Sequence, residues 1–538
     1  MTSPLACLHF APRRLLALLA LLALLALAAA AQSPHPNVLI SALGFPAETA
    51  IAINPKNPQE LVAGANLNFA YFSANGGRAW TRQVLASPQT VWGDPSVVCD
   101  TTGAFYFLHL TSPNAGTGPF SYAFPFIDRM QVQRAGSGAG PFGLRGSFGL
   151  RPPRQQDKGW LAVDRRTNAL YCTWTEFDAY GSLRFGDSAR ILFSRSLDGA
   201  LTWSAPQRVS RRGGDAADES ATVEGAVPAA GPNGEVYVSW AGPRGIEMNR
   251  SPDGGLSWLP QGERPVAAQP GGWSFDVPGT DRANGLPVTA CDLSRGPRRG
   301  TLYVNWCDQR NGAADTDVWL ASSADGGLSW AAPRRVNDDP AGTHQFLTWM
   351  TVDQATGHLW FVFYDRRHYP AGSRQTDVYG ARSTDGGLTF QNFRLSQTPF
   401  VPDPLGFLGD YTNIAAHNDV VRPCWTRMDA NRQTSVWTAL VNPALLAAAG
   451  PRLAALSLQA YPVPARDVLH VDLTLPAAAA VSLTLRDALG RAVVRRAVQL
   501  PAGAQEVPLP VLDLAPGAYT LDARLGAQQV HRQVLVQR

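Results

Sequence analysis

Ser323-Ala-Asp-Gly-Gly-Leu-Ser-Trp330 is one of five copies of an eight-residue motif in this chain. In each copy Asp or Asn is followed by Gly, and both residues tolerate the positive φ values of a tight turn. The Asp side chain can also accept hydrogen bonds from backbone amides of its own turn, and the final aromatic residue packs where the next strand begins. The other copies are Ser73-Ala-Asn-Gly-Gly-Arg-Ala-Trp80, Ser196-Leu-Asp-Gly-Ala-Leu-Thr-Trp203, Ser251-Pro-Asp-Gly-Gly-Leu-Ser-Trp258 and Ser383-Thr-Asp-Gly-Gly-Leu-Thr-Phe390.

A turn that recurs with an aromatic residue at a fixed offset indicates radially repeated β-sheets, which is a β-propeller. The motif resembles the Asp-box of the sialidase-like (BNR-repeat) propellers, and this resemblance implies their all-β fold. Such turns join the third and fourth strands of a blade, so we expect their acidic or amide residues to be structural. These residues are Asn75, Asp198, Asp253, Asp325 and Asp385.

The spacing of the turns predicts the number of blades. Asp198 and Asp253 are 55 residues apart, whereas Asn75 and Asp198 are 123 residues apart, which is the length of two repeats. A second pattern, an apolar strand followed by a turn and an aromatic-rich strand, occurs seven times between residues 51 and 426. We therefore predict seven blades. Six blades is the alternative, because most sialidase-like enzymes have six.

Composition divides the chain into four parts. Arg13 and Arg14 precede an apolar run that ends in alanines, so residues 1–31 are predicted to be a cleaved signal peptide. Residues 38–443 are the predicted propeller, and the Ala-rich residues 444–455 are a predicted linker. In residues 456–538 apolar and polar residues alternate, as is typical of strands. This pattern predicts a small C-terminal β-sandwich.

The C-terminal part contains three recognisable blocks. They are Tyr461-Pro-Val-Pro464, Asp487-Ala-Leu-Gly-Arg491 and Leu514-Ala-Pro-Gly-Ala-Tyr519, and a basic tail follows them. These blocks resemble the C-terminal sorting domain of the type IX secretion system. The resemblance implies a Bacteroidota-type Gram-negative bacterium, the type IX machinery as a partner, and a protein that is secreted or held on the outer-membrane surface.

Charge and hydropathy exclude other classes of protein. The 538 residues have a net charge of only +4, so composition gives no reason to expect nucleic-acid binding. After the signal peptide no segment is apolar enough to predict a transmembrane span. The cysteines show no metal-ligand spacing.

The propeller topology predicts where a site lies. Adjacent strands are antiparallel, so the starts of the innermost strands meet on the face opposite the repeated turns, around the central channel. Carboxylates grouped there have raised pKa values or need a cation, for which Ca²⁺ is a candidate. The alternative is that they only cap strand ends. The catalytic candidates are Asp94, Glu224, Asp410 and Tyr411, and the ligand-binding candidates are Glu48, Asp157 and Lys158.

Two loops after second strands belong to the same face. Each places Asp and Arg two residues apart beside aromatic residues, and such arginines can clamp carboxylates or sugar hydroxyls. Ion pairs within one blade are the alternative. The residues are Asp308, Arg310, Asp365, Arg366 and Arg367.

Three functions stay open at this stage. The first is a non-catalytic propeller that binds an extracellular glycan or a surface protein. The second is an exo-sialidase-like glycoside hydrolase, although the Phe/Tyr-Arg-Ile-Pro motif that supplies the first sialidase arginine is absent here. The third is a metal-dependent hydrolase or lyase that uses the acidic ring.

Overall fold

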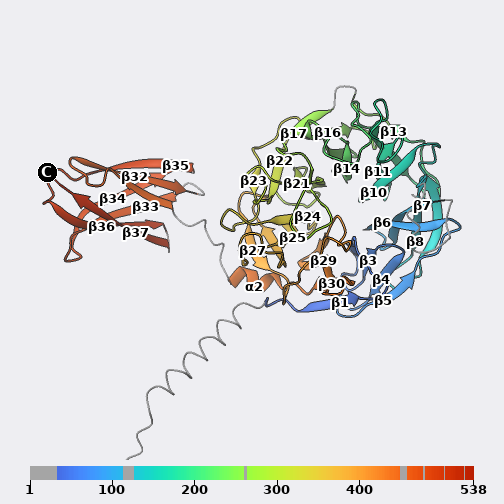
Figure 1. Cartoon of the computed structure of the whole chain (residues 1–538), viewed down its shortest axis with the longest axis horizontal. Coiled ribbons are helices and arrows are strands. Elements are labelled where there is room, and N and C mark those ends of the chain that lie inside the picture. Colours follow the sequence, from blue (N-terminus) through green and yellow to red (C-terminus); the bar gives the residue numbers. More distant parts are fainter. Residues whose placement is uncertain are drawn as a thin grey trace, which may run out of the picture. The chain divides into compact units, whose positions relative to one another are not determined.

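Seven four-stranded antiparallel sheets occupy the described residues between Asn37 and Ala439, and they are arranged around one axis (Figure 1). The structure is a computed structural model. It describes residues 33–112, 127–259, 263–448, 457–475, 479–501, 503–525 and 528–537. The signal peptide predicted for residues 1–31 lies outside these ranges. The chain divides into two compact units, residues 1–446 and 447–538.

The first four sheets each run from an innermost to an outermost strand in chain order. The first contains β2 (Ala50–Ile53), β3 (Leu61–Ala65), β4 (Phe69–Ser73) and β5 (Thr81–Val84). The second contains β6 (Thr90–Cys99), β7 (Phe105–Ser112), β8 (Arg129–Ala135) and β9 (Gly143–Phe148). The third contains β10 (Gln155–Val163), β11 (Leu170–Phe177), β12 (Ala189–Ser196) and β13 (Gln207–Arg208). The fourth contains β14 (Glu224–Ala230), β15 (Val236–Gly242), β16 (Gly245–Ser251) and β17 (Arg264–Ala267).

A two-stranded hairpin precedes the fifth sheet, and the last sheet combines both ends of this unit. The hairpin is β18 (Ser274–Phe275) and β19 (Ala283–Asn284). The fifth sheet contains β20 (Val288–Cys291), β21 (Leu302–Asp308), β22 (Asp317–Ser323) and β23 (Arg334–Arg335). The sixth contains β24 (Gln345–Val352), β25 (Leu359–Asp365), β26 (Asp377–Ser383) and β27 (Gln391–Arg394). The seventh contains β28 (Asn413–His417), β29 (Val420–Met428), β30 (Thr434–Ala439) and β1 (Asn37–Ser41).

The ring of sheets is closed. Each innermost strand contacts the innermost strand of the next sheet, and β28 contacts β2. The N-terminal strand β1 pairs antiparallel with β30, with Asn37 opposite Ala439. Because residues from both ends of the unit share one sheet, the closing contacts can form only when the whole ring is assembled. The sequence did not predict this role of residues 37–41.

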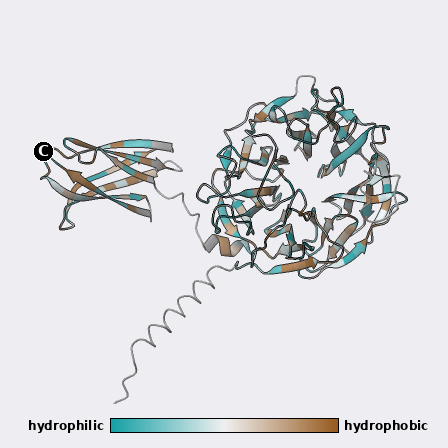
Figure 2. Cartoon of the chain, in the orientation of Figure 1, coloured by the Kyte–Doolittle hydropathy of each residue, from teal (hydrophilic) through white to brown (hydrophobic). Residues whose placement is uncertain are grey.

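The hydrophobic core lies between neighbouring sheets rather than at the centre of the ring. Phe107 of the second sheet packs with Val62 and Phe72 of the first, and Trp174 of the third packs with Leu108 of the second. All eight residues of β11 are buried, which explains their nearly continuous apolar sequence. Figure 2 shows hydrophobic and hydrophilic residues interspersed along the strands.

Each of the five repeated turns joins the third and fourth strands of its sheet. In the fifth sheet, Oδ1 of Asp325 accepts hydrogen bonds from the backbone amides of Leu328 and Ser329 at 3.0 Å each. Ser329 Oγ donates to the other carboxylate oxygen at 2.6 Å. The aromatic residue of a turn can reach the neighbouring sheet: Trp203 stacks on Phe148 with ring centroids 4.1 Å apart.

The C-terminal unit contains two antiparallel sheets that share one hydrophobic cluster. One sheet contains β31 (Ser457–Tyr461), β32 (Val468–Leu475) and β35 (Gly503–Pro510). The other contains β34 (Ala492–Leu500), β33 (Ala479–Arg486), β36 (Gly517–Leu525) and β37 (Gln528–Val536). In β33, Val481, Leu483 and Leu485 point into the cluster. The sequence pattern missed β31 and β35.

The first residues of the Ala-rich linker predicted for residues 444–455 are helical. They form helix α2 (Pro443–Ala448), and Leu446 is buried in the core of the first unit. Within the part of the chain that the structure describes, no helix is both long and apolar enough to cross a bilayer. The five described cysteines carry free thiols, and only Cys99 is not fully buried.

The turn hydrogen bonds lead to a prediction about stability. Asp325→Ala removes a carboxylate that accepts bonds from two backbone amides and two hydroxyls, so we expect a loss of about 1–2 kcal/mol in the free energy of unfolding. Chemical denaturation measures it. Glu219→Ala, at an exposed site, is the control and should change stability by less than about 0.5 kcal/mol. Equal stability of the two variants would contradict the structural role.

Candidate functional site at the mouth of the ring

The innermost strands start with a repeated backbone irregularity. Glu48, Asp94 and Lys158 have φ values of 51°, 48° and 47°, and the pairing register shifts at the start of β6, β10, β14 and β24. A bulge redirects the side chains beside it. The left-handed conformation costs a non-glycine residue about 1–3 kcal/mol and persists where surrounding contacts enforce it. Here it occurs at three charged residues that interact with one another.

These strand starts and two preceding loops form one group of side chains, which we call the mouth cluster. Its members interact electrostatically or through hydrogen bonds across five of the seven sheets. The mouth cluster consists of Glu48, Asp94, Asp157, Lys158, Asp218, Glu224, Arg282, Asp410 and Tyr411.

The centre of the mouth cluster is an ion triad. Lys158 Nζ lies 2.8 Å from Asp410 Oδ2, and Arg282 Nε donates to Asp410 Oδ1 at 2.6 Å while a second guanidinium nitrogen contacts Oδ2. The side chains of Lys158 and Asp410 are only 4% and 2% exposed, whereas that of Arg282 is 44% exposed. Burial would raise the pKa of Asp410, but the two cations outweigh it and hold the pKa at about 2. Asp410 is therefore ionised at neutral pH.

Three other carboxyl groups of the cluster, those of Glu48, Asp157 and Glu224, have raised pKa values. Burial raises the pKa of Asp157 to about 8, where the attraction of Lys158 opposes the repulsion of Asp94 and Asp218. Burial, followed by the repulsion of Asp94, raises the pKa of Glu48 well above its usual value. Burial and Asp218 do the same for Glu224, whose carboxylate oxygens accept no hydrogen bond from a described donor. Asp157 therefore holds a proton near pH 7, and burial also disfavours the ionised forms of Glu48 and Glu224.

Tyr411 closes the floor of the cluster. Its hydroxyl lies 3.5 Å from Asp94 Oδ1, and its ring packs edge-on against Trp160 with centroids 4.8 Å apart. The Trp349 ring packs against Trp160 with centroids 4.7 Å apart and the ring planes tilted by 49°. Burial and the nearby carboxylates raise the pKa of Tyr411 well above its usual value, so the hydroxyl stays protonated and acts as a hydrogen-bond donor.

Solvent reaches only part of the mouth cluster. Asp94, Asp157 and Asp218 are half-buried, whereas Glu48, Lys158, Glu224 and Asp410 are buried. The Phe407 ring is 42% exposed and lies beside the Arg282 guanidinium, 5.9 Å from ring centroid to carbon. A ligand at this face therefore meets three carboxyl groups, one guanidinium and an aromatic ring.

The structure brings together all seven strand-start candidates: Glu48, Asp94, Asp157, Lys158, Glu224, Asp410 and Tyr411. It places the five loop candidates elsewhere. Asp308 pairs with Arg310 at 2.6 Å and Asp365 pairs with Arg367 at 2.7 Å, so each carboxylate is engaged inside its own loop. Arg366 donates to Thr376 and stacks on Phe346. A ligand-binding role for these five residues stays a prediction.

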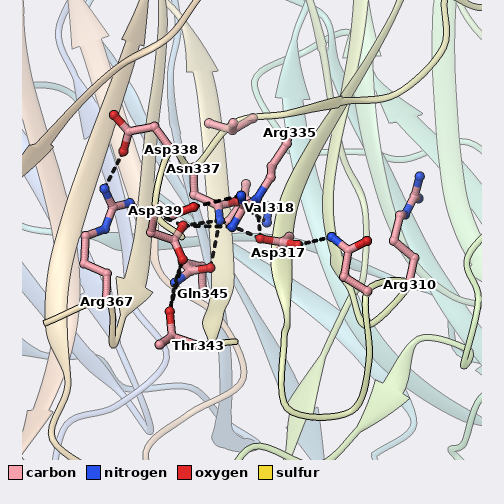
Figure 3. Close-up of polar contacts among 12 residues, drawn as sticks. Arg310, Asp317, Val318, Arg335, Asn337, Asp338, Asp339, Thr343, Gln345 and Arg367 are labelled. Carbon is pink, nitrogen blue, oxygen red and sulfur yellow. Dashed lines mark hydrogen bonds and ion pairs between the residues drawn. The ribbon is translucent and has the colours of Figure 1, made fainter. Parts of the chain in front are cut away.

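Figure 3 shows what surrounds two of these arginines. Arg367 reaches Asp338 on one side of a network between the fifth and sixth sheets, and Arg310 lies on the other side. At its centre Asn337 Nδ2 donates to Asp317, Asp339 and Gln345 at 2.6–2.7 Å. Because these buried groups satisfy one another, the network is a structural join between two sheets.

Sequence reasoning missed two members of the mouth cluster. Asp218 and Arg282 come from long connections that lead from an outermost strand to the next innermost strand, residues 209–223 and 268–287. Tyr180 donates a hydrogen bond to Asp218, and Asn284 donates to the backbone carbonyl of Asp410 at 2.9 Å. The unusual length of these two connections was the sequence feature that could have indicated their place in the cluster.

Because the cluster is rich in carboxyl groups, the sequence predicted that it could bind a cation. Over the described residues, no group of three His, Cys, Asp or Glu side chains is arranged to hold a metal ion. Lys158 and Arg282 supply positive charge at the centre instead. Calcium binding stays a prediction.

Comparison with known proteins supports the C-terminal assignment. Residues 459–537 match the family described as "Secretion system C-terminal sorting domain", which confirms the resemblance inferred from sequence. This domain indicates a secreted or cell-surface protein of a Bacteroidota-type bacterium and interaction with the secretion machinery. A search of curated proteins found no match.

Solved structures similar to the chain share little sequence with it. A Dyadobacter fermentans protein of unknown function is 15% identical, with a TM-score of 0.42 over 75% of this chain and 98% of that one. An ulvan lyase bound to its saccharide is 12% identical, with a TM-score of 0.43 over 78% and 98%. The Trypanosoma rangeli sialidase in complex with sialic acid is 10% identical, with a TM-score of 0.42 over 84% of each chain.

The raised pKa of Asp157 leads to a prediction about pH. Its folded-state pKa of about 8 lies above the value of about 4 for an unfolded Asp, so the native state holds a proton that the unfolded state releases. The free energy of unfolding then falls as pH rises from about 4 to 8. Asp157→Asn should remove this penalty and stabilise the protein at pH 8.5, and the stabilisation should disappear as pH falls to about 4. Denaturation across pH measures it.

Asp178→Asn is the matched control with the opposite sign. Burial would raise the pKa of Asp178, but Arg190 and Ser188 outweigh it and lower the pKa to about 2. This carboxylate stabilises the fold above the unfolded pKa, and its contribution is lost as pH falls through about 2. Asp178→Asn should therefore destabilise the protein at pH 8.5. A destabilised Asp157→Asn at that pH would contradict the protonated state of the cluster.

Proposed function

We propose that this chain is a secreted or cell-surface glycan-acting protein, in which seven sheets form the seven blades of a propeller and the mouth cluster binds the glycan. Closure of the ring through β1 and the contact between β28 and β2 support the blade count. The sorting domain supports an extracellular target. The convergence of half-buried carboxyl groups with Arg282 and Phe407 supports the location of the site.

The charge of the mouth cluster favours an uncharged sugar over an acidic one. Six carboxyl groups surround two cations, and both cations already contact Asp410. An acidic sugar needs positive charge that is not already paired. The sialidase resemblance implies arginines for this purpose, but the motif that supplies the first of them is absent here. Hydroxyl groups of a neutral sugar can instead donate to Asp94, Asp157 or Asp218, and Arg282 can donate to a sugar oxygen.

Aromatic side chains around the cluster support a sugar ligand. The exposed face of the Phe407 ring lies beside Arg282, and exposed Phe45 precedes Glu48 by three residues. Aromatic faces attract the polarised C–H groups of a sugar. Carboxylates at the edge of the aromatic ring then fix the orientation of the sugar ring. An extracellular protein ligand is the alternative occupant of the same surface.

Hydrolysis is the second candidate function, and one observation favours it. Asp157 holds a proton near neutral pH while Asp410 is ionised, each because of its surroundings. A carboxyl group that stays protonated near neutral pH is suited to the role of general acid. Asp157 is also reachable from solvent, so it can donate a proton to a glycosidic oxygen, and Asp94 is the neighbouring carboxyl group that can accept one from water.

The glycan proposal predicts a pattern of binding. Isothermal titration with neutral and sialylated oligosaccharides of matched length should show binding of a neutral class only. Asp94→Asn and Phe407→Ala should weaken it by about tenfold or more, because each removes a direct contact. Leu388→Ala, at an exposed position in a repeated turn, should leave it unchanged. Preference for the sialylated ligands, or unchanged binding in both variants, would contradict the proposal.

Product analysis separates hydrolysis from binding. If Asp157 is the general acid, the wild-type protein should release reducing ends from the bound glycan and Asp157→Asn should lower the rate by about 100-fold or more, with binding retained. Tight binding with no product from wild-type protein would leave glycan binding as the function and exclude this hydrolase.

The sorting domain gives an independent prediction about export. Removing residues 457–538 in a host with type IX secretion should leave the first unit in the periplasm, because the recognition element is lost. Fractionation with immunoblotting measures this, and the full chain with Leu388→Ala is the control. Appearance of the truncated chain in the medium would contradict the role of the domain.

A further inference from the structure

We propose that the glycan bound by the mouth cluster is an amino sugar, and that its ammonium group binds beside Asp157, Asp218 and Glu224. This inference rests on the proposed glycan-binding function and names the class of sugar. Asp157 belongs to β10, Asp218 to the connection after β13, and Glu224 to the start of β14. Each of the three interacts electrostatically with the other two, so they lie together on one side of the cluster.

Glu224 is the residue that points to a missing positive group. It is 0% exposed, and neither of its carboxylate oxygens accepts a hydrogen bond from a donor among the described residues. A buried carboxyl group normally has hydrogen-bond donors or a cation beside it, because burial without them is costly. The polar neighbours of Glu224 include two further carboxyl groups, those of Asp157 and Asp218. A ligand that brings N–H donors and a positive charge would supply what this group lacks.

The two cations of the cluster are engaged elsewhere. Lys158 Nζ pairs with Asp410 at 2.8 Å. Arg282 also pairs with Asp410, and its Nη1 lies 3.6 Å from Asp218 Oδ2. Lys158 attracts Glu224 as well, but burial outweighs this attraction, and no ion pair engages Glu224 within the part of the chain that the structure describes. With six carboxyl groups and two cations, the cluster attracts an additional positive charge.

An ammonium group suits this arrangement better than a metal ion. A hard metal ion needs six or more oxygen ligands at short distances, and the described residues contain no cluster of three acidic, His or Cys side chains arranged for a metal. An ammonium group instead has three N–H donors that can bind separate acceptors. Asp157 and Asp218 are half-buried, so a ligand from solvent can reach them. The sugar ring that carries the amino group can still contact Phe407.

Isothermal titration of the full chain at pH 6.5 tests the proposal with two probes of equal length. These are the β-1,4-linked tetramer of glucosamine and the same tetramer with every amino group acetylated. The amino tetramer should bind at least about tenfold more tightly, because acetylation removes the charge and keeps the sugar chain. Glu224→Gln should reduce this preference by about tenfold or more. Glu219→Gln, which removes an exposed carboxyl group beside Asp218 in sequence, is the matched control and should keep it.

Proton release gives a second measurement, which still decides if Glu224→Gln fails to fold. Asp157 holds a proton near pH 7, and an ammonium group beside a carboxyl group lowers its pKa. Titrations in buffers of different ionisation enthalpy should therefore show that the wild type releases more protons than Asp157→Asn on binding the amino tetramer. The acetylated tetramer should release none from either protein.

Three results would overturn the proposal. The first is an amino tetramer that binds no more tightly than the acetylated one; binding of the acetylated tetramer would then leave the proposed glycan function intact. The second is equal proton release by the wild type and Asp157→Asn. The third is a tetralysine peptide that binds as tightly as the amino tetramer, since it carries ammonium groups without sugar rings and would indicate a basic protein segment as the ligand.

Discussion

Asp410, held between Lys158 and Arg282, is the interaction on which the rest of the site depends. It joins β10, the hairpin before the fifth sheet, and the segment that leads into the last sheet. A buried charge pair of this kind gains little net stability over apolar packing, but loss of one partner costs several kcal/mol because a buried charge is left alone. The triad therefore acts as a constraint: the ring can close with this geometry only if all three segments are in place.

The triad also determines the state of the surrounding carboxyl groups. Lys158 and Arg282 keep Asp410 ionised, whereas at Glu48, Asp157 and Glu224 burial outweighs the attraction of Lys158 and raises the pKa. Asp157 keeps its proton near pH 7, so the cluster contains a hydrogen-bond donor as well as acceptors. A site with both kinds of group suits hydroxyl-bearing ligands, since each hydroxyl donates one hydrogen bond and accepts others. The left-handed backbone at Glu48, Asp94 and Lys158 indicates that close packing enforces this arrangement.

The sequence predicted a large part of this architecture. The repeated turns and their aromatic residues indicated a ring of similar sheets, and strand polarity alone placed Asp94, Asp157 and Asp410 on one rim. Side-chain partners could not be predicted in the same way. Arg310 and Arg367 are of the residue type expected in a ligand clamp, yet each pairs with the Asp two residues earlier in its own loop, and Arg367 also pairs with Asp338.

The sequence also did not predict the positions of residues in loops of irregular length. Arg282 and Asp218 reach the axis from connections with no repeating pattern, and β1 joins the last sheet through a contact between residues about 400 positions apart in sequence. Such placements depend on the closed ring and have no local signature. Two sheets lack the repeated turn, and both were still predicted: β6 to β9 from the doubled spacing between Asn75 and Asp198, and the last sheet from the repeated pair of strands.

The protonation state of Asp157 tests the central claim most directly. Infrared difference spectra of the wild type against Asp157→Asn, recorded across pH, isolate the carboxylic acid band of this residue. The band should be present at pH 6.5 and disappear with a midpoint near 8, as expected for a half-buried carboxyl group with a pKa of about 8 beside other acids. A band already absent at pH 6 would show an isolated, ionised carboxylate, and would contradict a coupled cluster around Asp410.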